Sequence, residues 1–186
     1  MAIIGNMSAE IGATSCLFPY TEAMGRYLEA TNRSHIAEAA RGNLNLTPDE
    51  GSSSYYDDVV EINLDILQPH MNGPYIPDLS HPLSKLKQAV EENSWPQMLS
   101  ASLVGSCSNS SFEDLMKVAG LIGQANKACA KMKIPFYVSR GSEQIRATAG
   151  DAGFLETMRD AGAISLSSSC GPCVGQWHRT DIPKVY

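Results

Sequence analysis

The 186-residue sequence lacks a basic excess, a long apolar run and a recognisable targeting segment. With 14 Lys and Arg against 20 Asp and Glu, its formal net charge is -6. We therefore expect no basic face that neutralises the phosphates of a nucleic acid or of an anionic membrane. No stretch approaches the roughly 20 apolar residues that a membrane helix needs. Residues 1–6 match neither a secretory signal nor an Arg-rich transit peptide, so the protein either stays where it is made or its true beginning is missing.

What the sequence does contain is enough apolar material, 43% of its residues, for one ordinary domain or parts of two. It also contains five cysteines, an odd number, of which Cys170 and Cys173 form a C-x-x-C pair. In a chain without an export signal, this usage favours metal or redox chemistry over structural disulfides. We therefore expect a reducing compartment.

The first half of the chain contains segments that predict helices, a strand and a linker. Residues 21–30 are strong helix formers, and Ser34 is expected to cap a second short helix that ends before Gly42. Residues 57–67 alternate apolar and polar side chains, which predicts a strand. Residues 68–82 contain four prolines, which predict a linker without regular structure and a domain boundary.

The second half alternates short apolar strands with amphipathic helices. The predicted strands are residues 101–105, 136–139 and 163–167, and the predicted helices are 112–133 and 151–161. Ser110 and Glu113 predict a capping box for the first helix, and Gly162 predicts the end of the second. The alternation predicts a three-layer α/β/α fold with a mostly parallel sheet.

Three of the cysteines follow strands of this predicted sheet. Cys107 comes directly after the first strand, whereas Cys170 and Cys173 follow the third. Ligand sites of such sheets lie outside the carboxyl ends of the strands, so the three thiols can share one site. A C-x-x-C pair alone is also typical of zinc sites and thioredoxin-like redox pairs, and buried unreactive cysteines are common.

Several motifs carry a resemblance to a known family. SLVGSCSNSSFEDL (residues 102–115) and SCGPCVGQW (169–177) resemble the two cluster motifs of the aconitase and isopropylmalate dehydratase superfamily. GSEQIRAT (141–148) is similar to the intervening segment of its mitochondrial-type aconitase branch. NMSAEIGAT (6–14) and MNGPYIPDL (71–79) match further segments, in the same order. Ser108 departs from the family, which usually has Thr at that position.

The resemblance implies a 4Fe–4S cluster held by Cys107, Cys170 and Cys173, with one iron open to substrate. It implies that Asn6 and Glu10, four residues apart on one helix face, contact substrate or water. The implied activity is that of an aconitate hydratase acting on a small tricarboxylic acid. Cys16 and Cys129 are expected to be core or surface thiols and not a fourth ligand.

Residues near the motifs receive lesser roles. Asn109 and Ser110 are expected to shape the cysteine loop. His178 stands where the family usually has Asp, and Arg140 where it commonly has Pro or a small residue. We assign no catalytic role to either one or to Arg146.

The resemblance also implies that the chain is a piece of a longer enzyme, because aconitases are several-fold longer. Residues 1–67 would end one α/β/α domain, 68–82 would form the linker, and 83–186 would begin the cluster domain. The remaining aconitase domains would be its partners, and the chain alone would show little turnover. Alternatives are a truncated protein that binds a cluster or zinc as a sensor or remnant, and a fragment of a homoaconitate or isopropylmalate hydro-lyase. The expected location is the mitochondrial matrix in a eukaryote, otherwise the cytoplasm.

Overall fold

The computed structural model describes residues 1–43 and 47–176. These form two compact units, a sheet unit (residues 1–13 and the chain from 96 onward) and a hairpin unit (14–95). The α-helices are α1 (Ala2–Met7), α2 (Glu22–Ala30), α3 (Ser34–Arg41), α4 (Leu86–Glu92), α5 (Phe112–Lys127), α6 (Glu143–Asp151) and α7 (Phe154–Asp160). The strands are β1 (His70–Asn72), β2 (Ser80–Pro82), β3 (Ser102–Val104), β4 (Phe136–Val138) and β5 (Ile164–Ser165), and short 3-10 helices are η1 (Ser8–Ile11), η3 (Ser52–Tyr55) and η4 (Leu83–Lys85). No helix of the described part is long and apolar enough to span a membrane.

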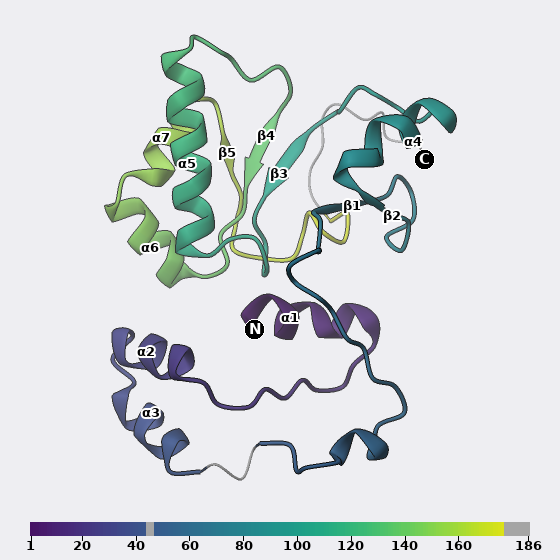
Figure 1. The fold of residues 1–186 in the computed structure, drawn as a ribbon. Coiled ribbons are helices and arrows are strands. Elements are labelled where there is room, and N and C mark those ends of the chain that lie inside the picture. The colour runs from purple at the N-terminus through teal and green to yellow at the C-terminus, as the bar shows by residue number, and fades with distance from the viewer. Residues whose placement is uncertain (44–46, 177–186) are drawn as a thin grey trace. The chain divides into compact units, whose positions relative to one another are not determined.

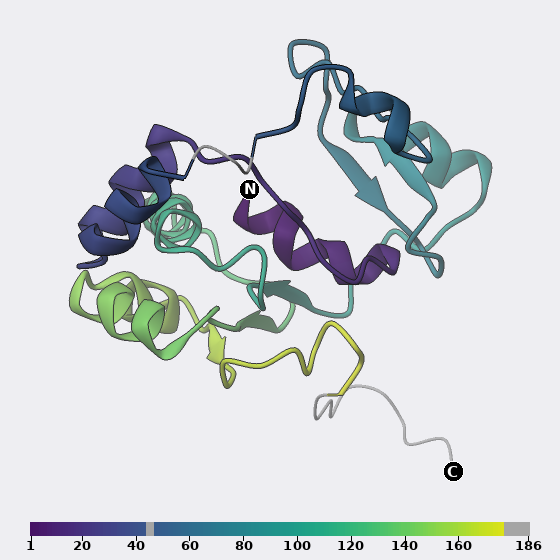
Figure 2. The same ribbon diagram turned by 90° about the horizontal axis from the view of Figure 1, so that it is seen from below.

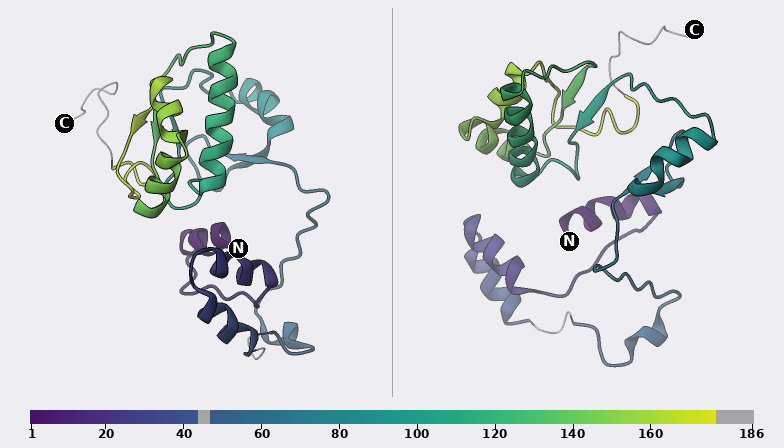
Figure 3. Two further views of the ribbon diagram at one scale, coloured as in Figure 1. Left: turned by 90° about the vertical axis from the view of Figure 1, so that its left-hand side faces the viewer. Right: turned by 45° about the horizontal axis from the view of Figure 1, so that its top comes forward.

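The sheet unit is built on three parallel strands in the order β3-β4-β5 (Figure 1). Leu103 pairs with Tyr137, and Tyr137 pairs with Ile164. Helix α5 connects the first two strands, and α6 and α7 connect the last two. These three helices lie side by side on one face of the sheet, as the two views of Figure 3 also show. The mixed α/β class and the parallel strands are confirmed, whereas the three-layer arrangement stays a prediction.

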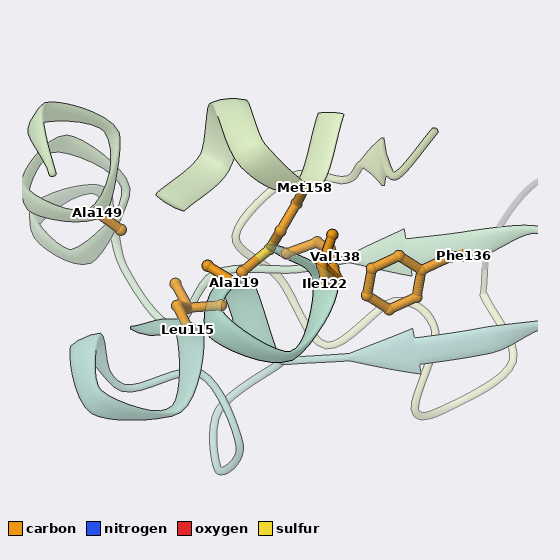
Figure 4. Close-up of a cluster of buried hydrophobic side chains, with 7 residues drawn as sticks. All are labelled: Leu115, Ala119, Ile122, Phe136, Val138, Ala149 and Met158. Atoms are coloured by element: carbon orange, nitrogen blue, oxygen red, sulfur yellow. The ribbon is translucent and has the colours of Figure 1, made fainter. Parts of the chain in front are cut away.

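The core of the sheet unit lies between this face and the helices, and Figure 4 shows its buried side chains: Leu115, Ala119, Ile122, Phe136, Val138, Ala149 and Met158. The three from α5 are spaced by four and three residues and so lie on one helix face. Strand β4 is buried at all three positions because it is the central strand. This core fixes α5 and β4, which in turn determine where the loops after the strands begin.

Helix α5 begins at Phe112 as predicted, but its capping pair differs from the predicted one and it ends earlier. Its capping box consists of Ser111 and Asp114, with the Ser111 Oγ accepting from the Asp114 amide at 3.1 Å. The predicted pair, Ser110 and Glu113, is therefore wrong by one residue. The helix ends at Lys127 and not at 133, because Cys129 takes a left-handed conformation at φ 58°.

The connection between β4 and β5 contains a helix that the sequence analysis did not predict. Ser142 caps α6 by accepting from the Ile145 amide at 3.1 Å. The predicted helix 151–161 is present as the shorter α7, and Gly162 follows it at φ 92° as expected.

In the hairpin unit, helices α2 and α3 are where the sequence predicted them. Thr21 caps α2 by accepting from the Met24 amide at 3.4 Å. Ser34 is the first residue of α3 and makes no cap, so its predicted capping role is wrong. Arg41 joins the two helices through ion pairs with Glu22 at 3.2 Å and Glu29 at 2.8 Å.

Two predictions for residues 57–82 are wrong. Residues 57–67 form no strand, since their alternating side chains are all exposed and no neighbouring strand pairs with them in the described part of the chain. The proline-rich segment 68–82, in turn, contains the antiparallel pair β1 and β2, with Asn72 opposite Ser80 (Figure 2). Its prolines are compatible with this pair because three lie outside the strands and Pro82 is the last residue of β2. The predicted division into 1–67, 68–82 and 83–186 concerns the domains of a longer protein and stays a prediction.

Candidate metal centre

The three predicted ligands follow strands whose carboxyl ends meet at one edge of the sheet. Cys107 lies in the loop after β3, and Cys170 and Cys173 lie in the loop after β5. Because β4 lies between these strands, the two loops start about 9–10 Å apart, two strand spacings. The residues that follow β4 therefore begin between the starts of the two loops.

Ser139, the first residue after β4, connects the two loops and is fully buried. Its amide donates to the Val104 carbonyl at 2.9 Å, and its carbonyl accepts from the Ser106 amide at 3.3 Å. Its Oγ lies 3.0 Å from the carbonyl of Ser167 and 3.4 Å from that of Ser169, and its hydroxyl donates to them. Sequence reasoning missed this residue, although a polar residue at the end of a central parallel strand is a usual sign of a site.

The loop that carries Cys107 begins with a close approach of two backbones. Gly105 has φ 131°, and a Cβ there would lie 1.7 Å from the Ser139 carbonyl oxygen, so only glycine fits. Ser106 is buried at φ 70°, and its carbonyl accepts from the Ser110 hydroxyl. Ser110 therefore shapes the cysteine loop, as its sequence position indicated.

The loop that carries Cys170 and Cys173 is a tight turn closed by its own backbone. The Gln176 amide donates to the Gly171 carbonyl at 2.7 Å, and the Gly175 amide donates to the Pro172 carbonyl at 3.1 Å. A Cβ on Gly171 would lie 2.7 Å from the Gln176 carbonyl oxygen. The turn therefore holds both cysteines on one short segment.

Asn6 reaches this region from helix α1. Its Nδ2 donates to the Cys107 carbonyl at 2.7 Å, across 101 positions of sequence. Glu10 lies in the 3-10 helix η1, so regular α-helical spacing does not extend over both residues. The Glu10 side chain makes no hydrogen bond or ion pair with the described residues. The structure thus brings Asn6 to the cysteine loop and leaves Glu10 exposed.

All three thiols are exposed and free of disulfides. Within residues 1–43 and 47–176, no three or more His, Cys, Asp or Glu side chains lie close enough together to hold a metal ion. The structure therefore aligns the two loops at one edge without gathering the thiols, and the ligand assignment stays a prediction.

The other two cysteines do not belong to these two loops. Cys129 follows the C-terminal end of α5, which runs back from the carboxyl edge of the sheet to the amino edge. Cys16 belongs to the hairpin unit, and both thiols are exposed. His178, the remaining candidate near the motifs, lies outside the described residues.

Comparison with known proteins identifies the family. The model of the aconitase family (aconitate hydratase) matches residues 1–185. The chain belongs to the aconitase family. Mitochondrial aconitate hydratases of Gracilaria gracilis and Schizosaccharomyces pombe are 50% and 49% identical to it over 99% of the chain. The mitochondrial homocitrate dehydratase of Saccharomyces cerevisiae is 50% identical over the whole chain.

These relatives are much longer than the chain, which spans 24% of the length of the homocitrate dehydratase and of the Gracilaria aconitate hydratase. Proteins of the aconitase family generally bind a 4Fe–4S cluster. The donors fit such a cluster in kind, because thiolates are its usual protein ligands. The described structure does not gather the three thiols, and from residue 170 to 176 the backbone hydrogen bonds of the second loop lie within its own turn. A local movement of this turn is enough to change the separation of the thiols, and metal binding is commonly coupled to such ordering.

Ser139 offers a test of how the loops are held. Ser139→Ala keeps the backbone bonds to β3 but removes the hydroxyl that donates to the carbonyls of Ser167 and Ser169. We expect the free energy of unfolding to fall by about 1 kcal/mol, the net contribution of a typical intramolecular hydrogen bond. Urea denaturation followed by circular dichroism measures this, with Ser53→Ala at an exposed position as the control. Equal stability of both variants would show that Ser139 does not hold the loop.

Proposed function

We propose that the chain is the cluster-bearing portion of an aconitate hydratase, a hydro-lyase that interconverts citrate and isocitrate through cis-aconitate. The observation that carries the proposal is the placement of three exposed, unbridged cysteines on two loops at one edge of a parallel sheet. The match of the family model over residues 1–185 supports it. We also propose the three-layer α/β/α architecture for the complete domain.

The proposed ligands are the thiolates of Cys107, Cys170 and Cys173. Three thiolates leave one iron of a four-iron cluster without a protein ligand, and this iron is then a Lewis acid toward hydroxyl and carboxylate oxygens. The tight turn at Gly171 presents two of the thiols together. Ser139 anchors the start of that loop to the loop of Cys107.

Asn6 and Glu10 are the proposed contacts to substrate and water. Because the Asn6 Nδ2 donates to the Cys107 carbonyl, the Asn6 Oδ1 is available to accept a hydrogen bond from a water beside that loop. The exposed Glu10 carboxylate is an acceptor for a substrate hydroxyl or water. Both residues bind and orient, and neither is proposed as the base that removes the carbon-bound proton.

The remaining domains of the longer enzyme are the proposed partners. Dehydration needs proton abstraction as well as activation of the leaving hydroxyl, and we assign the base and the carboxylate-binding groups to those domains. The proposed substrate is a small tricarboxylic acid. Relatives named aconitate hydratase and homocitrate dehydratase match the chain equally well, so the homologous substrates stay open as an alternative. The mitochondrial matrix is the proposed location, because these relatives are named as mitochondrial enzymes.

Mössbauer spectroscopy of the chain reconstituted anaerobically with ⁵⁷Fe tests the proposal. We expect citrate to change the signal of about one iron in four, because only one lacks a protein thiolate. Tricarballylate, which has the same three carboxylates without the hydroxyl, is the matched control and is expected to give a smaller change. A spectrum in which citrate alters no iron would contradict the proposal. The same sample is expected to form no cis-aconitate from citrate, and robust turnover would show that the chain carries the base.

A further inference from the structure

A cavity of about 210 Å³ lies between the ends of β4 and β5 and the helices α6 and α7. Three arginines line it, Arg140, Arg146 and Arg159, and Leu155 and Met158 give it an apolar side. A cavity of this size holds several water molecules. It is lined by none of the cysteines and is not used in the proposed reaction.

Arg140 is the most buried of the three arginines, with 8% of its surface exposed. Its Nη1 donates to the Ser165 hydroxyl, but its buried Nε has no hydrogen-bond partner. No ion pair of Arg140 is present among the described residues. Burial lowers the pKa of Arg140, which is the penalty for a guanidinium removed from water without a carboxylate beside it.

The other two arginines already have acidic partners on their own helices. Arg146 pairs with Glu143 three residues earlier, and Arg159 pairs with Glu156 at 3.0 Å. Glu143 also attracts Arg140, whereas Arg146 repels it. Three arginines and two glutamates therefore leave one positive charge without an acidic partner. That charge is on Arg140, the most buried of the three arginines.

We propose that this cavity binds a small oxyanion, a phosphate or a carboxylate group, with Arg140 as its principal ligand and Arg146 and Arg159 at its entrance. A guanidinium presents its donors in a planar fork that matches two oxygens of such a group. The anion would give the free Nε an acceptor and compensate the remaining charge. The apolar side formed by Met158, which is 1% exposed, strengthens these interactions by excluding water.

NMR titration of the ¹⁵N-labelled chain with inorganic phosphate tests this site through the Nε–Hε signals of its arginines. We expect saturable shifts of the Arg140 signal, and of amides in α6 and α7, that sodium chloride at equal ionic strength does not produce. An acetate titration forms the second arm, and the tighter of the two anions identifies the group. Absence of saturable shifts with either anion would overturn the proposal.

Substitutions of single arginines test whether the anion binds in this cavity. Arg140→Gln is expected to weaken anion binding about tenfold or more, as loss of a charge-assisted hydrogen bond does. Arg159→Gln, at a mostly exposed position, is expected to fold normally and to weaken binding less, and it decides the question if Arg140→Gln does not fold. Arg26→Gln removes the same charge from the hairpin unit and is expected to leave binding unchanged. Equal affinity of Arg159→Gln and Arg26→Gln would overturn the proposal.

Discussion

Single replacement of Cys107, Cys170 or Cys173 by serine is expected to remove the iron–sulfur cluster from the reconstituted chain. Each replacement leaves two thiolates, and a second iron would then lack its protein ligand. Iron and sulfide are expected to fall from about four of each per chain to a small fraction of that. Because all three thiols are exposed and make no core contacts, the far-ultraviolet circular dichroism of the variants is expected to match that of the parent.

The two remaining cysteines provide matched controls. Cys16→Ser and Cys129→Ser make the same chemical change at exposed positions, one in the hairpin unit and one after α5. Both variants are expected to retain the full iron and sulfide content. A cluster that survives loss of Cys107, or that disappears with Cys129, would show that the ligand assignment is wrong.

Gly105→Ala is expected to disrupt the sheet unit. The new Cβ would lie 1.7 Å from the Ser139 carbonyl oxygen, and φ 131° is a conformation that alanine rarely adopts. Relief requires β3 and β4 to separate where the cysteine loop begins. We expect the free energy of unfolding to fall by about 3 kcal/mol or more, and the cluster not to form.

Gly120→Ala is the control for this substitution. Gly120 lies within α5 with nothing within 4 Å of an added Cβ, so alanine is expected to stabilise the helix by about 0.5–1 kcal/mol. Urea denaturation of both variants, with iron analysis after reconstitution, measures the two effects. Unchanged stability and full cluster content in Gly105→Ala would refute the close approach of the two backbones.

The sequence predicted the elements whose signals are local. Helix α2 lies within the predicted helical segment 21–30, and Gly162 follows the end of α7 as predicted. The parallel strands were predictable because β4 is a short apolar segment between helical segments. Errors occurred where a local pattern is decided by distant partners. Residues 57–67 alternate like a strand but have no strand to pair with in the described part, and two short strands pair across a proline-rich turn.

The candidate metal centre was also predictable only where it depends on local sequence signals. Cys107 and the pair at 170 and 173 could be assigned to one sheet edge from strand positions alone. The role of Ser139 could not, because it depends on the strand order β3-β4-β5, which makes β4 central. Nor does spacing alone indicate that Asn6 reaches the Cys107 carbonyl across 101 positions. Such contacts depend on tertiary packing, which the periodicity of apolar residues in the sequence does not predict.

The most direct test of the central claim is the iron, sulfide and zinc content of the unaltered chain after anaerobic reconstitution with both metals present. The account predicts about four irons and four sulfides per chain, bound by three thiolates. About one zinc per chain without sulfide, as in a structural thiolate site, would contradict it.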